Sequence, residues 1–233
     1  MSAIYPEVIA HRGLSSEYPE NTLIAVGKAI EAGVKWIEVD VHLSYDGKII
    51  IIHDETVDRT TNGHGFAGDM TSPELKALDA GSWKNSAFKK TRIPLLDEML
   101  ELVKGRARIN IEIKCGFGII TPLIETIELF GMEKEIKLSC FNLNLLKIIK
   151  DNYPDFEMGA LLEDDKAILS AINMGFNDLH LPIKYLNGRI VNLINEHNGR
   201  SFYYTVNNME ALERCISLGV DGIFSDCADK FVR

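Results

Sequence analysis

Polar residues whose side chains could take part in catalysis follow or interrupt four short apolar segments of the sequence. They are His11-Arg12-Gly13, Glu38-x-Asp40, His53-Asp54 and Glu112-x-Lys114. A strand normally continues apolar or turns to solvent, so charges that project inward need compensation. Three carboxylates, two imidazoles and two cationic side chains would make a costly core unless a metal and an anionic ligand completed it. The set therefore indicates metal-assisted chemistry on a phosphate.

The three carboxylates are expected to form a metal site. Side chains along a strand alternate with a period of two, so Glu38, Asp40 and His42 share one face, and Glu112 and Lys114 share one face of another strand. Hard divalent cations prefer oxygen ligands, and Mg²⁺ fits best, with Ca²⁺ or Mn²⁺ as alternatives. Salt bridges would explain any single carboxylate, whereas three on adjacent strand ends favour the metal.

Two histidines are candidates for proton transfer. His11 ends one predicted strand and His53 another, and one imidazole can deprotonate an attacking hydroxyl while the other protonates a leaving alkoxide. Arg12 offers a planar fork to phosphate oxygens and Lys114 a point charge, unless either holds a carboxylate in place. His42 shares the carboxylate face but lies nearer the rim, so its role stays open. The other histidines are expected to be packed or exposed: His64, His180 and His197.

The elements that would position these residues alternate between strands and helices, which is the pattern of βα units around a parallel sheet. Eight strands are predicted, at 7–10, 36–41, 109–113, 136–139, 157–161, 178–181, 202–205 and 221–224. Helices between them include 22–32, 143–152 and 209–218. Eight such strands close an α/β fold of the (β/α)₈ TIM-barrel type. A further apolar segment, 49–52, follows Asp46-Gly47, which favours an antiparallel hairpin.

The domain organisation is expected to be simple. The chain has 233 residues, 46% of them hydrophobic, which predicts a single domain over residues 1–233. Residues 54–94 are polar and glycine-rich, and they are too many for an ordinary βα connection. They predict a small insertion after the second barrel strand, beside the active face. Nearer the N-terminus, either Asn21 or Thr22 is expected to be the N-cap of the predicted helix 22–32.

Composition and charge limit the classes of ligand and partner that the protein can be expected to bind. The net charge of −9 argues against nucleic acid and anionic membranes as ligands. The four cysteines lie far apart, without zinc-site spacing, and are expected to be reduced. No apolar run approaches the ~20 residues of a membrane span, and no signal-like segment begins the sequence. We expect a cytoplasmic enzyme that acts on a small molecule, without stable membrane association. Many barrels dimerise, so a homodimer is a further expectation.

An ordered series of motifs resembles the glycerophosphodiester phosphodiesterase family over nearly the whole chain. Besides the four motifs above, the matching segments are Glu20-Asn21, Asp58-Arg59-Thr60-Thr61, Pro94-x-Leu96-x-Glu98, Ser139-Cys140-Phe141, Thr205-Val206-Asn207 and 219–226. The resemblance implies a barrel with an insertion and the hydrolysis of glycerophosphodiesters to sn-glycerol 3-phosphate and an alcohol. It also implies dependence on Mg²⁺ or Ca²⁺.

The resemblance also implies the site residues. The metal ligands would be Glu38, Asp40 and Glu112, and the general acid–base pair His11 and His53. The residues that bind substrate or phosphate would be Arg12, Lys114, Asn21 and Tyr204. Tyr204 stands where a tryptophan is common in the family, and Cys140 where a serine is common, which bears on substrate preference. Either water or the glycerol 2-hydroxyl could be the nucleophile.

Three alternatives remain open. A phospholipase D-like enzyme acting on lysophospholipids would need an apolar rim, although scattered apolar residues in an insertion more often form its own core. The candidates for such a rim are Phe66, Met70, Leu75, Trp83 and Phe88. A non-catalytic phosphodiester-binding barrel would lack site residues that are all present here. An unrelated phosphosugar isomerase or aldolase would not need two histidines with three carboxylates.

Overall fold

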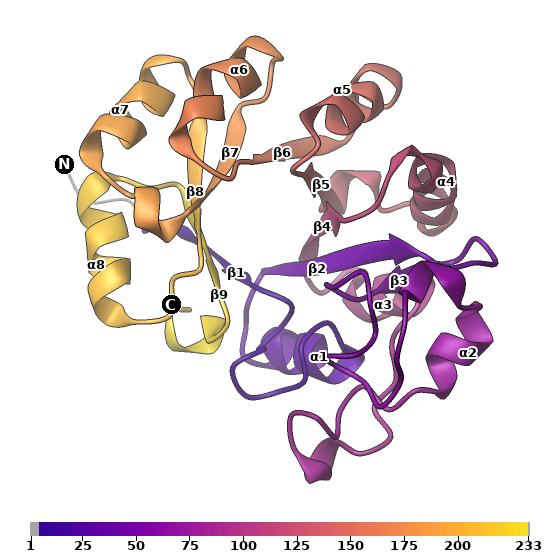
Figure 1. The fold of residues 1–233 in the computed structure, drawn as a ribbon. Coiled ribbons are helices and arrows are strands. Elements are labelled where there is room, and N and C mark those ends of the chain that lie inside the picture. The colour runs from indigo at the N-terminus through magenta and orange to yellow at the C-terminus, as the bar shows by residue number, and fades with distance from the viewer. Residues whose placement is uncertain (1–4, 233) are drawn as a thin grey trace.

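The computed structural model describes residues 5–232, and its core is a closed barrel of eight parallel strands (Figure 1). In chain order these strands are β1 (Glu7–Ala10), β2 (Trp36–Leu43), β4 (Arg108–Ile113), β5 (Ile136–Cys140), β6 (Glu157–Leu161), β7 (Asp178–Pro182), β8 (Arg200–Tyr204) and β9 (Gly222–Ser225). They are hydrogen-bonded in the order β1-β9-β8-β7-β6-β5-β4-β2, and pairing of β1 with β2 closes the ring. The predicted (β/α)₈ barrel is confirmed.

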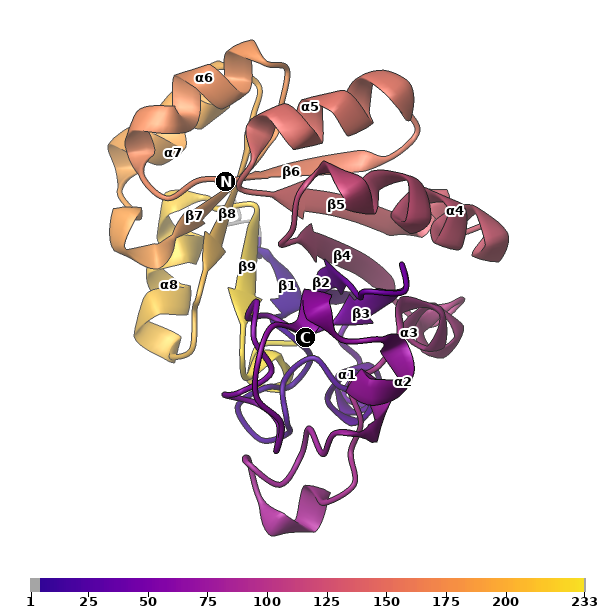
Figure 2. The same cartoon turned by 45° about the vertical axis from the view of Figure 1, so that its right-hand side comes forward.

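Helices surround the barrel and cover its outer face (Figures 1 and 2). They are α1 (Leu23–Glu31), α3 (Leu96–Val103), α4 (Ile120–Phe130), α5 (Leu143–Asn152), α6 (Ile168–Asn173), α7 (Gly188–Glu196) and α8 (Met209–Leu218). Short 3₁₀ helices occupy Phe117–Ile119, Glu133–Glu135, Asp165–Ala167, Ile183–Tyr185 and Ala228–Lys230. Each strand turns alternate apolar residues toward these helices, as Val39, Val41 and Ile111 show with no exposed surface.

The predicted hairpin is also present. Strand β3 (Ile49–Ile51) pairs antiparallel with the end of β2, and Gly47 in the intervening turn has a φ of +76°, which glycine adopts readily. The segment that follows carries a 3₁₀ helix at Ala67–Asp69, helix α2 (Ser72–Ala77) and a second 3₁₀ helix at Ser86–Phe88. Together with β3 and Ile52 it forms a small separate apolar core, made up of Ile50, Ile52, Val57, Ala67, Leu75, Ala80 and Ile93. This segment lies beside α1 and β3 (Figure 2).

Element boundaries differ from the prediction by one or two residues, mostly where polar residues begin or end a strand. Strand β8 begins at Arg200 rather than 202, because Arg200 pairs in register with Asp178 of β7 and forms an ion pair with Glu7. At the start of α1, Thr22 is the N-cap: its side-chain oxygen accepts a hydrogen bond from the backbone N–H of Ala25. Asn21 has a different role, described below.

The interior of the barrel is filled at its amino-terminal end, so the site can open only at the other end. Lys137 is 2% exposed and forms a buried ion pair with Asp178. Its ammonium group also lies 5.3 Å from the ring centre of Trp36 and 4.5 Å from that of Phe202. Parallel barrels place their active sites at the carboxyl ends of the strands, and here the charged motifs lie at that end.

Candidate active site

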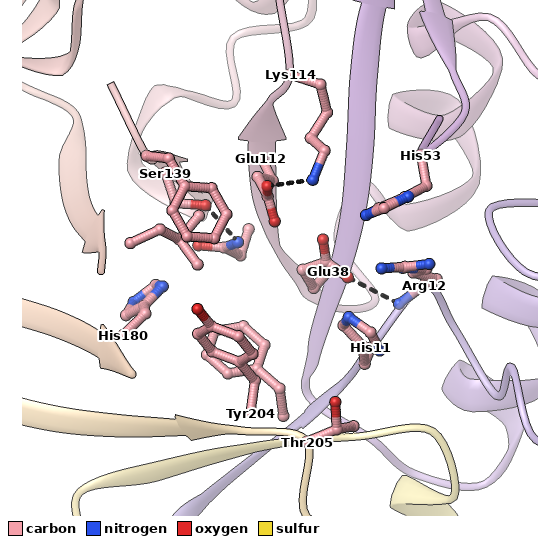
Figure 3. Close-up of a pocket in the computed structure, with 14 residues that line it drawn as sticks. His11, Arg12, Glu38, His53, Glu112, Lys114, Ser139, His180, Tyr204 and Thr205 are labelled. Carbon is pink, nitrogen blue, oxygen red and sulfur yellow. Dashed lines mark hydrogen bonds and ion pairs between the residues drawn. The ribbon is translucent and has the colours of Figure 1, made fainter. Parts of the chain in front are cut away.

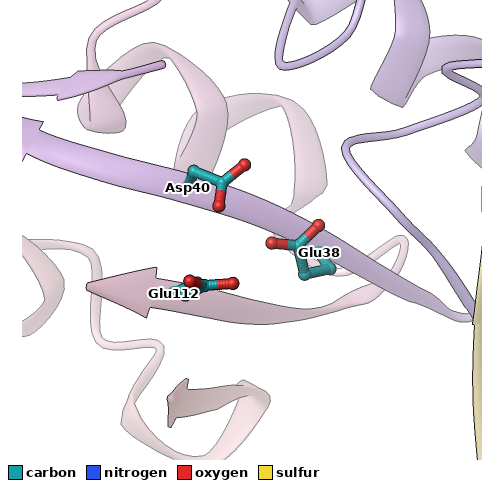
Figure 4. Close-up of side chains that lie close together, drawn as sticks. All are labelled: Glu38, Asp40 and Glu112. Atoms are coloured by element: carbon teal, nitrogen blue, oxygen red, sulfur yellow. The ribbon is translucent and has the colours of Figure 1, made fainter. Parts of the chain in front are cut away.

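Three carboxylates from neighbouring strands converge on one point. Asp40 of β2 lies directly beside Glu112 of β4 in the sheet register, and Glu38 lies one inward-facing position earlier on β2. One ligand oxygen from each lies within 4.8 Å of the others, and all three side chains are buried (Figure 4). Glu38 Oε1 and Asp40 Oδ1 have no hydrogen-bond partner within residues 5–232. Two unsatisfied buried carboxylate oxygens fit a divalent cation.

The electrostatics of this cluster also call for a cation. Burial, then the charges of Asp40 and Glu112, raise the pKa of Glu38 well above its usual value. Burial and the charge of Asp40 likewise raise the pKa of Glu112. For Asp40, burial acts in the same direction, but the charges of Arg12 and Lys114 outweigh it and lower the pKa. A bound divalent cation would favour the ionised form of all three.

Two cationic side chains border the carboxylates. Arg12 Nε lies 3.1 Å from Asp40 Oδ2, and Arg12 Nη1 donates a hydrogen bond of 2.8 Å to Glu20 Oε1. Lys114 Nζ lies 2.6 Å from Glu112 Oε1 and 3.5 Å from Asp40 Oδ1. Both cations also line the pocket described below, so each can contact an anion there while it balances the carboxylates.

Both candidate histidines are held by an aspartate in the same manner. Nδ1 of His11 lies 2.7 Å from Asp226 Oδ1, and Nδ1 of His53 lies 2.6 Å from Asp54 Oδ1. A carboxylate at Nδ1 fixes the neutral tautomer that carries its proton there, which leaves Nε2 free to accept a proton. Burial, followed by the charge of Arg12, lowers the pKa of His53 against the opposing effects of Asp40 and Asp54.

The two aspartates are themselves held differently. Asp226 accepts hydrogen bonds from the Ser15 hydroxyl, at 3.0 Å, and from the Asn207 amide, at 2.7 Å. Asp54 accepts two from the guanidinium of Arg59, at 2.7 and 3.0 Å, and Arg59 in turn donates two hydrogen bonds of 2.9 Å to Glu20. Because Glu20 also binds Arg12, an ionic chain connects residues 54–94 with the β1–α1 loop.

These groups surround a pocket of about 150 Å³ at the carboxyl ends of the barrel strands (Figure 3). The predicted residues that line it are His11, Arg12, Glu38, His53, Glu112, Lys114 and Tyr204. The remaining lining residues are Asn110, Ser139, Phe141, Leu161, His180, Thr205 and Phe224. The hydroxyl of Tyr204 donates a hydrogen bond of 3.0 Å to the carbonyl oxygen of Leu162, so its ring forms a fixed wall.

Asn21 does not line this pocket. Its amide donates a hydrogen bond of 2.8 Å to Asp40 Oδ2, and its side-chain oxygen accepts one of 3.1 Å from the backbone N–H of Asp40. Asn21 therefore lies behind Asp40 and fixes the orientation of that carboxylate. The φ of +58° at Asn21 is tolerated better by asparagine than by most other residues.

The remaining histidines differ in their surroundings. His42 is buried, and its Nε2 lies 3.1 Å from the carbonyl oxygen of His53, so it supports the chain at that histidine. His64 and His197 are exposed. His180 is packed between Phe202 and Phe224, and burial lowers its pKa well below the usual value. The expectation of packed or exposed positions is confirmed, although His180 also borders the pocket.

Sequence reasoning missed the residues that orient the histidines. Asp54 adjoins His53 in the sequence, and Arg59 lies in a motif that matches the family, so both could have been proposed. Asp226 is 215 residues from His11, and neither periodicity nor spacing connects the two. Only closure of the barrel, which pairs β1 with β9, brings them together.

Known proteins share both the sequence and the fold. The model of the glycerophosphoryl diester phosphodiesterase family matches residues 11–230. A glycerophosphodiester phosphodiesterase of Caldanaerobacter subterraneus is 40% identical over 233 residues, covering 97% of this chain and 96% of that protein. One of Bacillus altitudinis is 35% identical over 243 residues, covering 97% of each.

Solved structures agree. A phosphodiesterase of Oleispira antarctica, in complex with the product sn-glycerol 3-phosphate, has a TM-score of 0.92 at 30% identity, covering 97% of this chain and 95% of that one. A glycerophosphodiester phosphodiesterase of Agrobacterium tumefaciens has a TM-score of 0.85 at 31% identity, covering 97% and 98%. Fold and site thus define a barrel enzyme of the phosphoric diester hydrolase class. The chain belongs to the glycerophosphoryl diester phosphodiesterase family.

Proposed function

We propose that the chain hydrolyses glycerophosphodiesters to sn-glycerol 3-phosphate and an alcohol, with a divalent metal held by Glu38, Asp40 and Glu112. The observation that carries the proposal is the pair of unsatisfied carboxylate oxygens, buried beside two aspartate-bound histidines in one pocket. Oxygen ligands and a need for open coordination positions favour Mg²⁺ over Ca²⁺ or Mn²⁺. Such a metal supplies charge stabilisation to a phosphoryl oxygen.

The two cations would bind the phosphate. The fork of Arg12 and the ammonium group of Lys114 both reach the pocket, and each is already balanced by a carboxylate. A phosphodiester that enters carries one negative charge, which these groups can accept once the metal has neutralised part of the carboxylate charge. Tyr204 forms a wall of the pocket, where it would contact the glycerol moiety.

The histidines would move the protons. With Nδ1 bound to an aspartate, each presents Nε2 as the atom that can exchange a proton with the substrate. One takes the proton of the attacking hydroxyl, which belongs either to water or to the glycerol 2-hydroxyl. Attack by the 2-hydroxyl first gives a cyclic phosphate, which a water molecule must then open to sn-glycerol 3-phosphate. The other donates a proton to the oxygen of the departing alcohol. Asn21 acts on this reaction through Asp40, because it lies behind that carboxylate.

We further propose that the chain is one domain in which residues 54–94 are an insertion. The small apolar core of this segment and its position against β3 support the assignment. The cytoplasm is the proposed compartment, and the four free cysteines support it. Within residues 5–232, no helix has both the length and the apolarity needed to cross a bilayer. A homodimer stays a prediction.

The decisive experiment is the release of sn-glycerol 3-phosphate from a panel of glycerophosphodiesters, with Mg²⁺, Ca²⁺, Mn²⁺ or a chelator present. Release that depends on metal would support the proposal and identify the preferred ion. No release with any metal would contradict it. Glu112→Ala should weaken metal affinity at least tenfold by calorimetry, and Glu101→Gln, which changes an exposed acid on α3, is the control. An unchanged affinity would remove Glu112 from the ligand set.

A further inference from the structure

A second hollow adjoins the pocket and is open to solvent. It has a volume of about 690 Å³, and we call it the rim groove. One wall comes from the insertion, the floor from the ends of β2 and β4, and the other wall from the loop after β5. Three residues line both the rim groove and the pocket: Glu112, Lys114 and Phe141. The rim groove therefore begins at the proposed phosphate position.

The walls of the rim groove combine aromatic rings with carboxylates. Phe66 is 55% exposed and Phe141 is 40% exposed, and both line the rim groove, so a ligand in the groove would cover them. Glu55 and Asp69, on the insertion wall, are exposed. Neither carboxylate forms an ion pair with any residue between 5 and 232, although Glu55 is close enough to His42 to influence its pKa. The insertion thus faces the groove with unbalanced negative charge.

The two hollows differ in size and in charge, and this difference orients a phosphodiester. The smaller pocket, of about 150 Å³, reaches down to Asn110, Ser139 and His180, which suits a small moiety with hydroxyl groups. The rim groove is larger, open and acidic on one side. With the phosphate at Lys114 between them, the glycerol moiety enters the pocket and the alcohol moiety extends along the rim groove.

The following step rests on the proposed function. We propose that the rim groove binds the alcohol moiety of the substrate and selects an alcohol that carries an ammonium group. An ammonium ion is attracted both to carboxylates and to the faces of aromatic rings, and Phe66 supplies such a face. The ring of Phe141 already has Lys114 Nζ 5.8 Å from its centre, so it completes the wall without offering a free face. Neutral or anionic alcohols gain neither attraction, and an anionic one is repelled by Glu55 and Asp69.

The exposed phenylalanines could instead cover an acyl chain, as in the lysophospholipid alternative. The insertion offers little apolar surface inside the rim groove, because Trp83, although 38% exposed, does not line it. Leu75 has no exposed surface, and Phe88 is half-buried against Tyr18, with 5.7 Å between ring centres. An acyl chain would also have to pass the unpaired carboxylates of Glu55 and Asp69. The walls therefore favour a compact cation over a chain.

The test compares two esters of equal shape. One is the choline ester of glycerol 3-phosphate, and the other is its 3,3-dimethylbutyl isostere, in which carbon replaces the quaternary nitrogen. We expect kcat/KM for the choline ester to exceed that for the isostere about tenfold, which corresponds to one cation–π contact and nearby carboxylates. Equal values would overturn the proposal, and so would faster turnover of an acylated choline ester than of the deacylated one.

Substitutions in the rim groove can show which residues cause the preference for the choline ester. Glu55→Gln combined with Asp69→Asn should lower the ratio between the two esters to near one, and Phe66→Leu should lower it several-fold. The matched control is Glu101→Gln with Glu125→Gln, which removes two exposed acids of α3 and α4 that do not line the groove. A similar fall of the ratio in this control would assign the preference to net charge and contradict the groove.

The outcome also separates this inference from the proposed reaction. If either ester is hydrolysed, the reaction stands and the ratio decides the rim groove. If neither is hydrolysed with any divalent metal, the proposed reaction fails. The same protein then tests the groove through the two dissociation constants, measured by calorimetry. Tighter binding of the choline ester would still support the ammonium site, and equal binding would reject it.

Discussion

The two histidine–aspartate pairs make the same contact but are supported by different parts of the molecule. The first pair, His11 and Asp226, comes from the ends of β1 and β9, and Asp226 is held by neutral donors from Ser15 and Asn207. In the second pair, Asp54 follows His53 directly and is held by the Arg59 guanidinium, which continues to Glu20. The barrel thus orients one imidazole, and the segment 54–94 orients the other.

This difference indicates what residues 54–94, which we propose to be an insertion, contribute to the site. Without residues 54–94 the barrel would keep the three carboxylates, both cations and the first histidine, but it would lose the support of the second. The same segment provides the acidic wall of the rim groove. In the proposed mechanism, one segment therefore supports the second histidine and also shapes the groove that would bind the alcohol.

Removing either imidazole should have the largest effect. His11→Ala and His53→Ala should each lower kcat by about 10²- to 10⁴-fold, because each removes one proton transfer, while metal affinity is retained. Turnover and calorimetric metal titration on the same preparations check this. If either variant keeps near-wild-type turnover, that histidine is not an acid–base residue, and the comparison between two equivalent pairs fails.

Changing the aspartates should have the next largest effect. In Asp226→Asn and Asp54→Asn an amide can donate to Nδ1, which favours the wrong tautomer, so kcat should fall about 10²-fold or more in each. Histidine ¹⁵N chemical shifts would report the tautomer directly. Normal tautomers combined with normal turnover would show that these aspartates only pack against the rings.

A smaller effect should separate the two pairs. Arg59→Met should lower kcat about tenfold through His53, because a partner that orients a site residue has been removed. The hydrogen bonds from Arg59 are the main cause of the lowered pKa of Asp54, so that pKa should rise and the acid limb of the pH–rate profile should move to higher pH. Arg189→Met, at an exposed position on α7, is the control. An unchanged profile in Arg59→Met would mean that the ionic chain does not act on catalysis.

The smallest effect concerns stability in acid. Burial opposes ionisation of Asp226, but its hydrogen bond from His11 lowers its pKa from 3.8 to about 2. A lowered pKa in the folded state means that Asp226 stabilises the fold fully above 3.8, and that this contribution is lost as the pH falls toward about 2. Urea denaturation across this range should show a shallower fall in stability for Asp226→Asn than for the wild type. Equal slopes would contradict this account.

The sequence revealed the parts of the site that follow from local periodicity. Alternation along β2 and β4 was enough to place Glu38, Asp40 and Glu112 together, and Asp46-Gly47 was enough to predict the hairpin. The ends of the strands could not be predicted in the same way. Strand β8 begins at Arg200 because this residue pairs with Asp178, which is distant in the sequence.

Relations that depend on closure of the barrel could not be predicted. The contact between His11 and Asp226 has no local signature, and the position of Asn21 behind Asp40 depends on how the β1–α1 loop packs. The rim groove likewise forms only when the insertion faces the loop after β5. Apolar residues of the insertion could be identified, but which of them stay exposed is decided by tertiary packing.

The contact between the first and last strands of the barrel has a consequence for how the enzyme is made. His11 emerges early from the ribosome, and Asp226 emerges 215 residues later. All three carboxylates have been synthesised once β4 is complete, whereas the aspartate that holds the first histidine follows β9, the last strand of the ring. A chain truncated before Asp226 would contain the three carboxylates but lack the partner of His11, so we expect it to have no turnover.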